Sequence, residues 1–150
     1  MRRSAAAICS LIGPSTWTSG ASSASRRLES SSAALDRGAD VLAAYEDRTA
    51  RYLNFSGASV IWEQPDTSMD GLIEELLRAG REVVARTKPW EGERPGPPSP
   101  GQARINLLTP SGLHFGQGAL AALAGDALAG PVIAAATALM QALTRRATAD

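Results

Sequence analysis

The chain has 150 residues, a length typical of one domain that buries its own hydrophobic core. Fifteen basic and fifteen acidic residues balance, but residues 1–28 hold four arginines and no acid, so the remaining chain is net negative. This charge disfavours nucleic-acid binding, which requires a basic surface. A single cysteine, Cys9, excludes a disulfide within the chain and a cysteine-based metal site, and it favours a cytoplasmic location.

Residues 1–30 are rich in serine and alanine, with an apolar stretch at residues 5–13, and residues 1–28 carry only positive charge. This composition is typical of a disordered tail, and it also resembles a targeting peptide with small residues at 21–25 as a cleavage site. Both interpretations place the segment outside the fold. We therefore expect one folded domain over residues 31–150.

A helix is predicted over residues 29–49, because apolar residues recur there at spacings of three and four. Two short stretches rich in aromatic and β-branched residues follow, at Arg51–Phe55 and Ala58–Trp62. Glycine permits the positive φ of a tight turn, so Ser56-Gly57 between them indicates a β-hairpin.

The most regular helical pattern lies at residues 67–86, where Thr67 and Asp70 have the spacing of a helix start. Its apolar stripe would anchor the helix to a sheet. Residues 88–102 contain five prolines and three glycines, so neither a helix nor a strand is expected to pass through them. They are predicted to form an exposed loop.

A second hairpin is predicted from strands at Arg104–Thr109 and Leu113–Gly116, joined by a turn at Thr109–Gly112. The last helix is expected from Pro131 to about Arg146, with little polar surface. The predicted fold is therefore α+β, with a largely antiparallel sheet of about four strands from two hairpins and helices packed on one side. A membrane span is disfavoured, because Asp126 and Gly130-Pro131 interrupt the apolar C-terminal region.

Two regions are candidate contact surfaces for a protein partner or for self-association as a homodimer. One is the apolar last helix with Leu139, Met140 and Leu143, which exceeds what one small sheet readily covers. The other is the proline-rich loop. Its Trp90 either pins the loop to the core or forms a binding hot spot, and its Arg94 begins an R-x-x-P-x-x-P pattern typical of polyproline docking peptides.

An alternative interpretation is a small hydrolase or ligand-binding protein with its site at residues 109–118. His114 is the single histidine of the chain, and it could act as a general base if Ser111 and Asn106 converged on it. On a strand, His114 would point away from Leu113 and Phe115, toward the more polar face. The nearby glycines lack the spacing of a phosphate-binding loop. No cofactor or metal ion is expected, and non-enzymatic protein binding or scaffolding is the leading prediction.

The segment RINLLTPSGLHFGQGALAALAGDALAGPVIAAATALMQAL, together with the earlier RYLNFSGASVIWEQP, resembles a family of small uncharacterised bacterial proteins. The resemblance implies a bacterial source and a folded region beginning near residue 35, and it implies no site residues. The predicted order of elements is also similar in outline to roadblock-type domains, which are small dimeric α+β adaptors for switch proteins. The proline-rich loop and residues 116–130 depart from that outline.

Overall fold

A computed structural model describes residues 6–12, 39–54, 58–93, 98 and 101–149. Within them, six strands form one antiparallel sheet in the order β4-β3-β2-β1-β5-β6. The elements are β1 (Ala6–Ile12), β2 (Ala39–Tyr45), β3 (Ala50–Leu53), β4 (Ser59–Trp62), α1 (Asp70–Arg86), β5 (Gln102–Thr109), β6 (Gly112–Ala119), α2 (Leu120–Ala124) and α3 (Ala129–Ala149).

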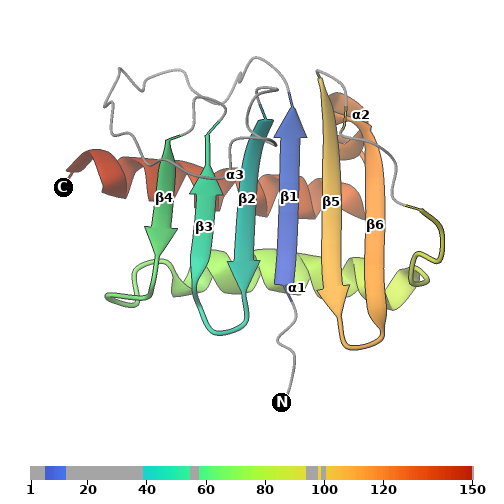
Figure 1. Ribbon diagram of the computed structural model, residues 1–150, viewed down its shortest axis with the longest axis horizontal. Coiled ribbons are helices and arrows are strands. Elements are labelled where there is room, and N and C mark those ends of the chain that lie inside the picture. Colours follow the sequence, from blue (N-terminus) through green and yellow to red (C-terminus); the bar gives the residue numbers. More distant parts are fainter. Residues whose placement is uncertain (1–5, 13–38, 55–57, 94–97, 99–100, 150) are drawn as a thin grey trace.

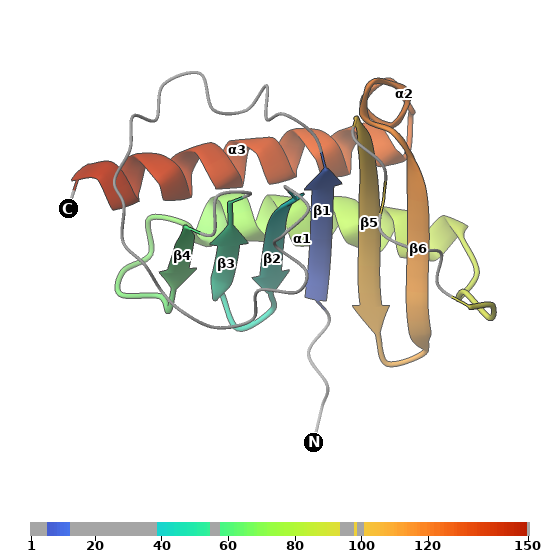
Figure 2. The ribbon, with the colours of Figure 1, turned by 45° about the horizontal axis from the view of Figure 1, so that its top comes forward.

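The molecule has two layers, a sheet and a pair of long helices (Figure 1). Helices α1 and α3 pack against each other and cross the same face of the sheet, as the tilted view in Figure 2 also shows. No described helix or strand covers the opposite face, which we call the helix-free face. The predicted α+β class, the antiparallel pairing and the placement of helices on one side are confirmed, although the sheet has six strands rather than about four.

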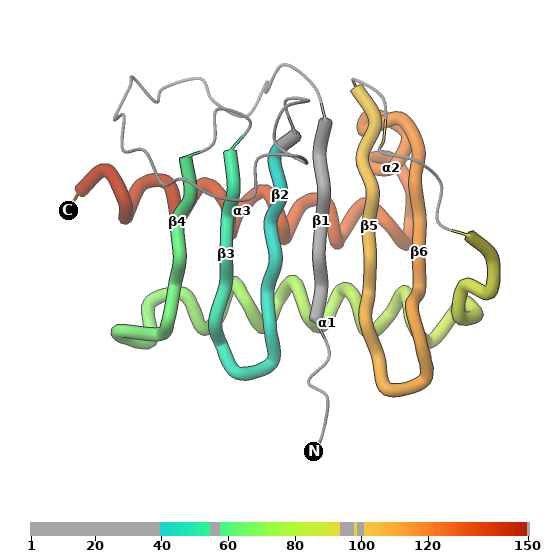
Figure 3. The backbone as a smooth tube through the Cα atoms, in the orientation of Figure 1, coloured from blue at the N-terminus to red at the C-terminus, as the bar shows by residue number. Residues whose placement is uncertain are grey.

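Both predicted hairpins are present, as β3–β4 and β5–β6. The β5–β6 turn is tight because Thr109 pairs directly with Gly112, and the Thr109 hydroxyl donates a hydrogen bond to the Gly112 carbonyl at 2.9 Å. Gly112 has a φ of 134°, a conformation that favours glycine. Figure 3 shows this turn beside the tight β2–β3 connection, at the same end of the sheet.

The prediction of a helix over residues 29–49 is wrong for the described part of that range, where β2 and a turn are found. Leu42 and Ala44 face the helices, and both neighbours of β2 are strands. In a central strand both faces are partly buried, so the two-residue alternation is weak and alanines obscure it further. Pairing with distant strands therefore overrode a chance helical spacing.

β1 lies within the segment that the sequence places outside the fold. It occupies a central position in the sheet, between β2 and β5. Its stretch AAICSLI mixes two isoleucines with alanine and serine, so its strand propensity is only moderate. Only the long-range pairing to both neighbours reveals it as a strand.

α1 begins at Asp70, with Met69 rather than the predicted Thr67 at its N-cap, and no side-chain hydrogen bond caps the helix. The Asp66 carboxylate instead accepts a hydrogen bond from the Ser68 amide, which holds a turn ahead of the helix. The predicted apolar stripe is correct in position. Its central members are buried, namely Ile73, Leu76 and Leu77.

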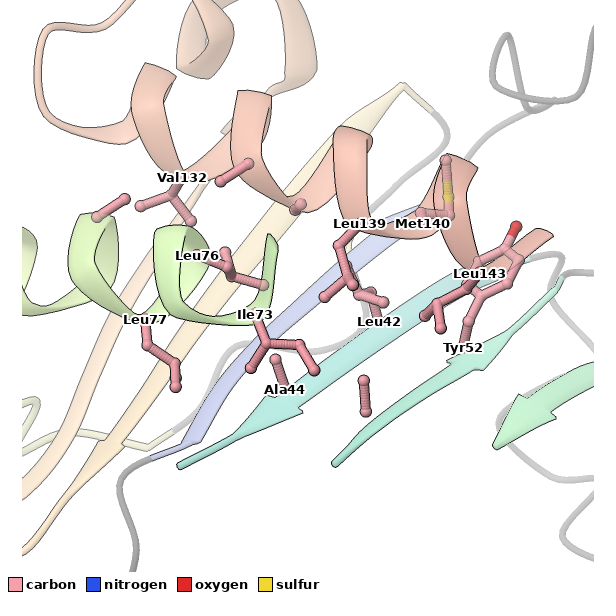
Figure 4. Close-up of a cluster of buried hydrophobic side chains, with 14 of the residues drawn as sticks. Leu42, Ala44, Tyr52, Ile73, Leu76, Leu77, Val132, Leu139, Met140 and Leu143 are labelled. Atoms are coloured by element: carbon pink, nitrogen blue, oxygen red, sulfur yellow. The ribbon is translucent and has the colours of Figure 1, made fainter. Parts of the chain in front are cut away.

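The core lies between the helix pair and the sheet (Figure 4). Leu139 and Leu143 of α3 point toward Ile73 of α1 and toward Leu42 and Tyr52 of the strands. The alanine-rich sequence of α3 lets the two helices approach closely.

Candidate functional site

Side chains of the β5–β6 hairpin alternate strictly between the two faces of the sheet. Leu107 lies beneath α1, where a Cβ on Gly80 would approach its side chain to 2.9 Å. His114 is the register partner of Leu107 and is likewise buried. Leu108, Leu113 and Phe115 therefore face the other way, onto the helix-free face.

His114 was expected on the more polar face, and that prediction is wrong. Its ring is 3% exposed and lies under the end of α1, where Nδ1 is 2.8 Å from the Thr87 hydroxyl oxygen. That hydroxyl already donates its hydrogen to the Val83 carbonyl, so His114 Nδ1 carries a hydrogen and donates it. His114 Nε2 is also buried, and it has no hydrogen-bond partner among the described residues.

The convergence of His114, Ser111 and Asn106 does not occur. Asn106 is the register partner of Phe115, so it faces away from the helices and from His114. Ser111 lies at the exposed turn, where its hydroxyl is 2.9 Å from that of Thr109. Ser111 and Asn106 do not reach the histidine, and the hydroxyl that does, that of Thr87, donates its hydrogen to the Val83 carbonyl, so the geometry of the described residues offers no support for the predicted hydrolase site.

The residues of α3 selected as a contact surface lie in the core instead. Leu139 and Leu143 are fully buried and Met140 is 3% exposed. The expectation that one sheet could not cover this helix overlooked α1, which packs along α3 and shares the cover with the strands. These three residues are therefore not available to a partner in this fold.

Trp90 both pins its loop and remains accessible. Its backbone amide donates a 2.6 Å hydrogen bond to the Leu113 carbonyl, so the loop pairs with the edge of β6. Its ring lies 5.5 Å from the ring of Phe115 on the helix-free face, and its Nε1 donates to the Glu93 carbonyl. The side chain of Trp90 is nevertheless 44% exposed. Arg94, the other loop candidate, lies outside the described residues.

Arg104 extends this aromatic pair. Its guanidinium lies 5.1 Å from the centre of the Phe115 ring, and its Nε donates a 3.0 Å hydrogen bond to the Gln117 side chain. The planar cation is thus fixed beside the Phe115 ring by a cation–π contact and a hydrogen bond. We call the group formed by Trp90, Arg104, Leu108 and Phe115 the Trp90 patch.

The other end of the helix-free face has a mixed polar and apolar character. Ile61 is 56% exposed there, on the opposite side of β4 from the buried Trp62. A shallow hollow of about 430 Å³ adjoins it. The hollow is lined by Tyr45, Asp47, Thr49, Arg51, Ile61, Trp62 and Glu63. Between the two ends, Ala43 and Asn106 are buried.

A strongly shifted pKa occurs at Tyr52, which lies on the face of the sheet that the helices cover. Burial raises the pKa of Tyr52 well above its ordinary value of 10.0, and the charge and hydrogen bond of Asp40 raise it further. Asp40 is itself 4% exposed, so this pair is a polar contact within the core. It does not adjoin the Trp90 patch, because Tyr52 faces the helices.

The sequence missed three members of the Trp90 patch, namely Arg104, Leu108 and Phe115. Their signal is the two-residue alternation of β5 and β6, which becomes interpretable once one knows which face the helices cover. Among the described residues no group of histidine, cysteine, aspartate and glutamate side chains could hold a metal ion. No described helix is both long and apolar enough to cross a membrane.

Comparison with known proteins gives no match. No family model, no curated protein and no solved structure is significantly similar to this chain. Any functional conclusion therefore depends on the chain's own geometry.

Proposed function

We propose that this protein is a non-enzymatic interaction module that binds a protein partner through the helix-free face of its sheet. One observation supports this more than any other. The large hydrophobic side chains that stand exposed among the described residues are Ile61, Trp90 and Leu108, and all three lie on that face. An apolar surface gathered on one side is typical of a contact site rather than of random surface composition.

The composition of the Trp90 patch favours protein recognition. Tryptophan and arginine are the residues most enriched at binding hot spots, because they combine a large apolar area with directed polar contacts. In this patch both are held in place by Phe115. A partner would therefore meet side chains that already have a fixed conformation, and binding would cost little side-chain entropy.

The cellular location of this module and the system in which it acts are proposed from the sequence rather than from the sheet surface. A cytoplasmic location and a role in a bacterial multiprotein system are consistent with the single cysteine and with the family resemblance of the sequence. The partner is another protein or a second copy of this chain. A hydrolase has less support, because His114 is buried and its ring contacts the Thr87 hydroxyl rather than Ser111.

The proposal can be tested by photo-crosslinking in bacterial cells. A photoreactive amino acid at position 108 should yield a discrete protein adduct, which mass spectrometry would identify as a partner or as a second copy. Adding Trp90→Ala should reduce the yield at least tenfold, which corresponds to a loss of about 1.4 kcal/mol or more in binding.

The matched control is the same photoreactive residue at position 86, which is exposed on α1. It should not give the adduct that position 108 gives. Equal adducts at both positions, or none at position 108, would show that the helix-free face has no special affinity for proteins.

A further inference from the structure

The sheet consists of two separately formed parts joined by β1. β4, β3 and β2 pair in succession on one side, and β5 pairs with β6 on the other. β2 and β5 do not pair with each other, and β1 lies antiparallel to both. Without β1, the edges of β2 and β5 would face each other across two strand spacings, about 9.5 Å.

Two features hold this gap open independently of β1. α1 packs on β2, α3 packs on α1 and reaches β4, and α2 connects α3 with β5 and β6. The same helices thus tie both parts of the sheet together. β2 and β5 also run parallel to each other, so direct pairing would need a new hydrogen-bond pattern as well as movement of the packed helices.

The gap would be unfavourable if empty. The residues beside it on the covered face are Leu42 and Ala44 on β2 and Ile105 and Leu107 on β5, and all are at most 4% exposed. Loss of the central strand would hydrate these side chains and leave two rows of backbone donors and acceptors without sheet partners. The exposed edges of β2 and β5 could then bind an extended segment by strand addition, provided that its apolar side chains alternate in register with the covered face.

The connection between β1 and β2 does not dictate which copy of β1 fills the gap. Antiparallel neighbours are commonly joined by two to five residues, as β5 and β6 are here, whereas residues 13–38 separate β1 from β2. Register is therefore set by the strand edges and not by a turn. A covalent connection of this length adds an effective concentration in favour of the chain's own strand and makes no new contact with the edges.

From this arrangement we propose that the gap between β2 and β5 is a strand-binding site that accepts the Ala6–Ile12 segment of a second copy in place of its own. The seven residues of that segment match both edges over their full length. The contacts made in cis and in trans are identical, so the tether alone favours the intramolecular form.

The experiment uses the full chain with a protease site introduced between residues 21 and 25, cut after folding. The probe is a fluorescent peptide of residues 4–14 in which Cys9→Ser prevents oxidation. The cut chain should bind the probe and release its own fragment, and the uncut chain should bind the probe at least tenfold more weakly. A probe that also carries Ile8→Pro should lose binding at least tenfold, because proline removes a hydrogen-bond donor from a central strand.

A locked chain shows where the probe binds. Ile8→Cys and Asn106→Cys, in a Cys9→Ser background, place two thiols at register partners of β1 and β5. Their disulfide should abolish probe binding, even after the tether is cut. Probe binding to the locked chain would overturn the proposal, and so would a cut chain that keeps its fold without binding the probe. A cut chain that unfolds and is not restored by the probe would overturn it as well.

Discussion

At the scale of single residues, the contact between Tyr52 and Asp40 sets how stability depends on alkaline pH. Burial, the Asp40 charge and the hydrogen bond to Asp40 raise the pKa of Tyr52 in the folded protein above the value of 10.0 expected for an unfolded chain. Between those two values the unfolded chain loses a proton that the folded protein keeps. The stabilising contribution is therefore complete below about pH 10 and is lost as the pH rises.

We expect the free energy of unfolding to fall above pH 10 by up to about 1.4 kcal/mol per pH unit from this residue. Tyr52→Phe should remove that slope, as measured by chemical denaturation across the alkaline range. The variant should also be less stable at neutral pH, because Asp40 stays buried with one donor fewer. Tyr45→Phe, at a residue on the helix-free face, is the control. Equal slopes in the two variants would contradict the assignment.

His114 shows what a sequence can predict at this scale and what it cannot. The alternation along β6 correctly separates His114 from Leu113 and Phe115. The prediction assigned the wrong face to the core, because Leu113 and Phe115 are apolar and suggested that their face of the sheet was the buried one. Thr87 at the end of α1 hydrogen-bonds to Nδ1 of the imidazole from 27 positions away in sequence, and no local sequence pattern predicts that contact.

At the scale of elements, two glycines of α1 differ sharply in their surroundings. A Cβ at Gly80 would lie 2.9 Å from Leu107 Cδ2, whereas a Cβ at Gly71 would meet nothing within 4 Å. Gly71→Ala should therefore raise the free energy of unfolding by about 0.5–1 kcal/mol, since alanine loses less backbone entropy in a helix.

Gly80→Ala gains the same helical preference but must displace the buried Leu107 side chain, and overpacking of this kind costs about 1–3 kcal/mol. We expect this variant to be less stable than the Gly71→Ala variant by at least about 1 kcal/mol. Urea denaturation of both variants measures the difference. Equal stabilisation by the two substitutions would show that the Leu107 side chain moves aside at little energetic cost.

The elements also show why some segments were predictable and others were not. α1 and β5 carry strong local patterns and were found close to their predicted bounds, whereas β6 continues three residues past its predicted end, to Ala119. β1 and β2 lie in the middle of the sheet and are rich in alanine, so their local patterns are weak or misleading. Their conformation is decided by partners far away in the chain, which single-sequence patterns do not reveal.

At the scale of the whole molecule, a targeting peptide, as one interpretation of the sequence predicts, is incompatible with the observed position of β1. The composition of the N-terminal segment resembles a targeting peptide with a cleavage site near residues 21–25, yet β1 lies before that site and completes the sheet. Cleavage would separate β1 from the rest of the chain. A cleaved chain would then depend on a retained fragment or on a strand from another copy, which connects the strand-binding proposal with the function of this segment.

The packing of α3 leads to the last prediction, which distinguishes a core helix from an interface helix. Leu139 is fully buried between α1 and the sheet, so Leu139→Ala should lower the free energy of unfolding by about 2–5 kcal/mol. Leu139→Glu should prevent folding, since the core offers this carboxylate no partner. Gln141→Glu adds the same charge at an exposed position of the same helix, and it should stay within about 0.5 kcal/mol of the parent. Circular dichroism and light scattering test these expectations together. A folded Leu139→Glu chain of lower solution mass than the parent would mean that α3 is buried by a partner rather than by its own sheet and α1.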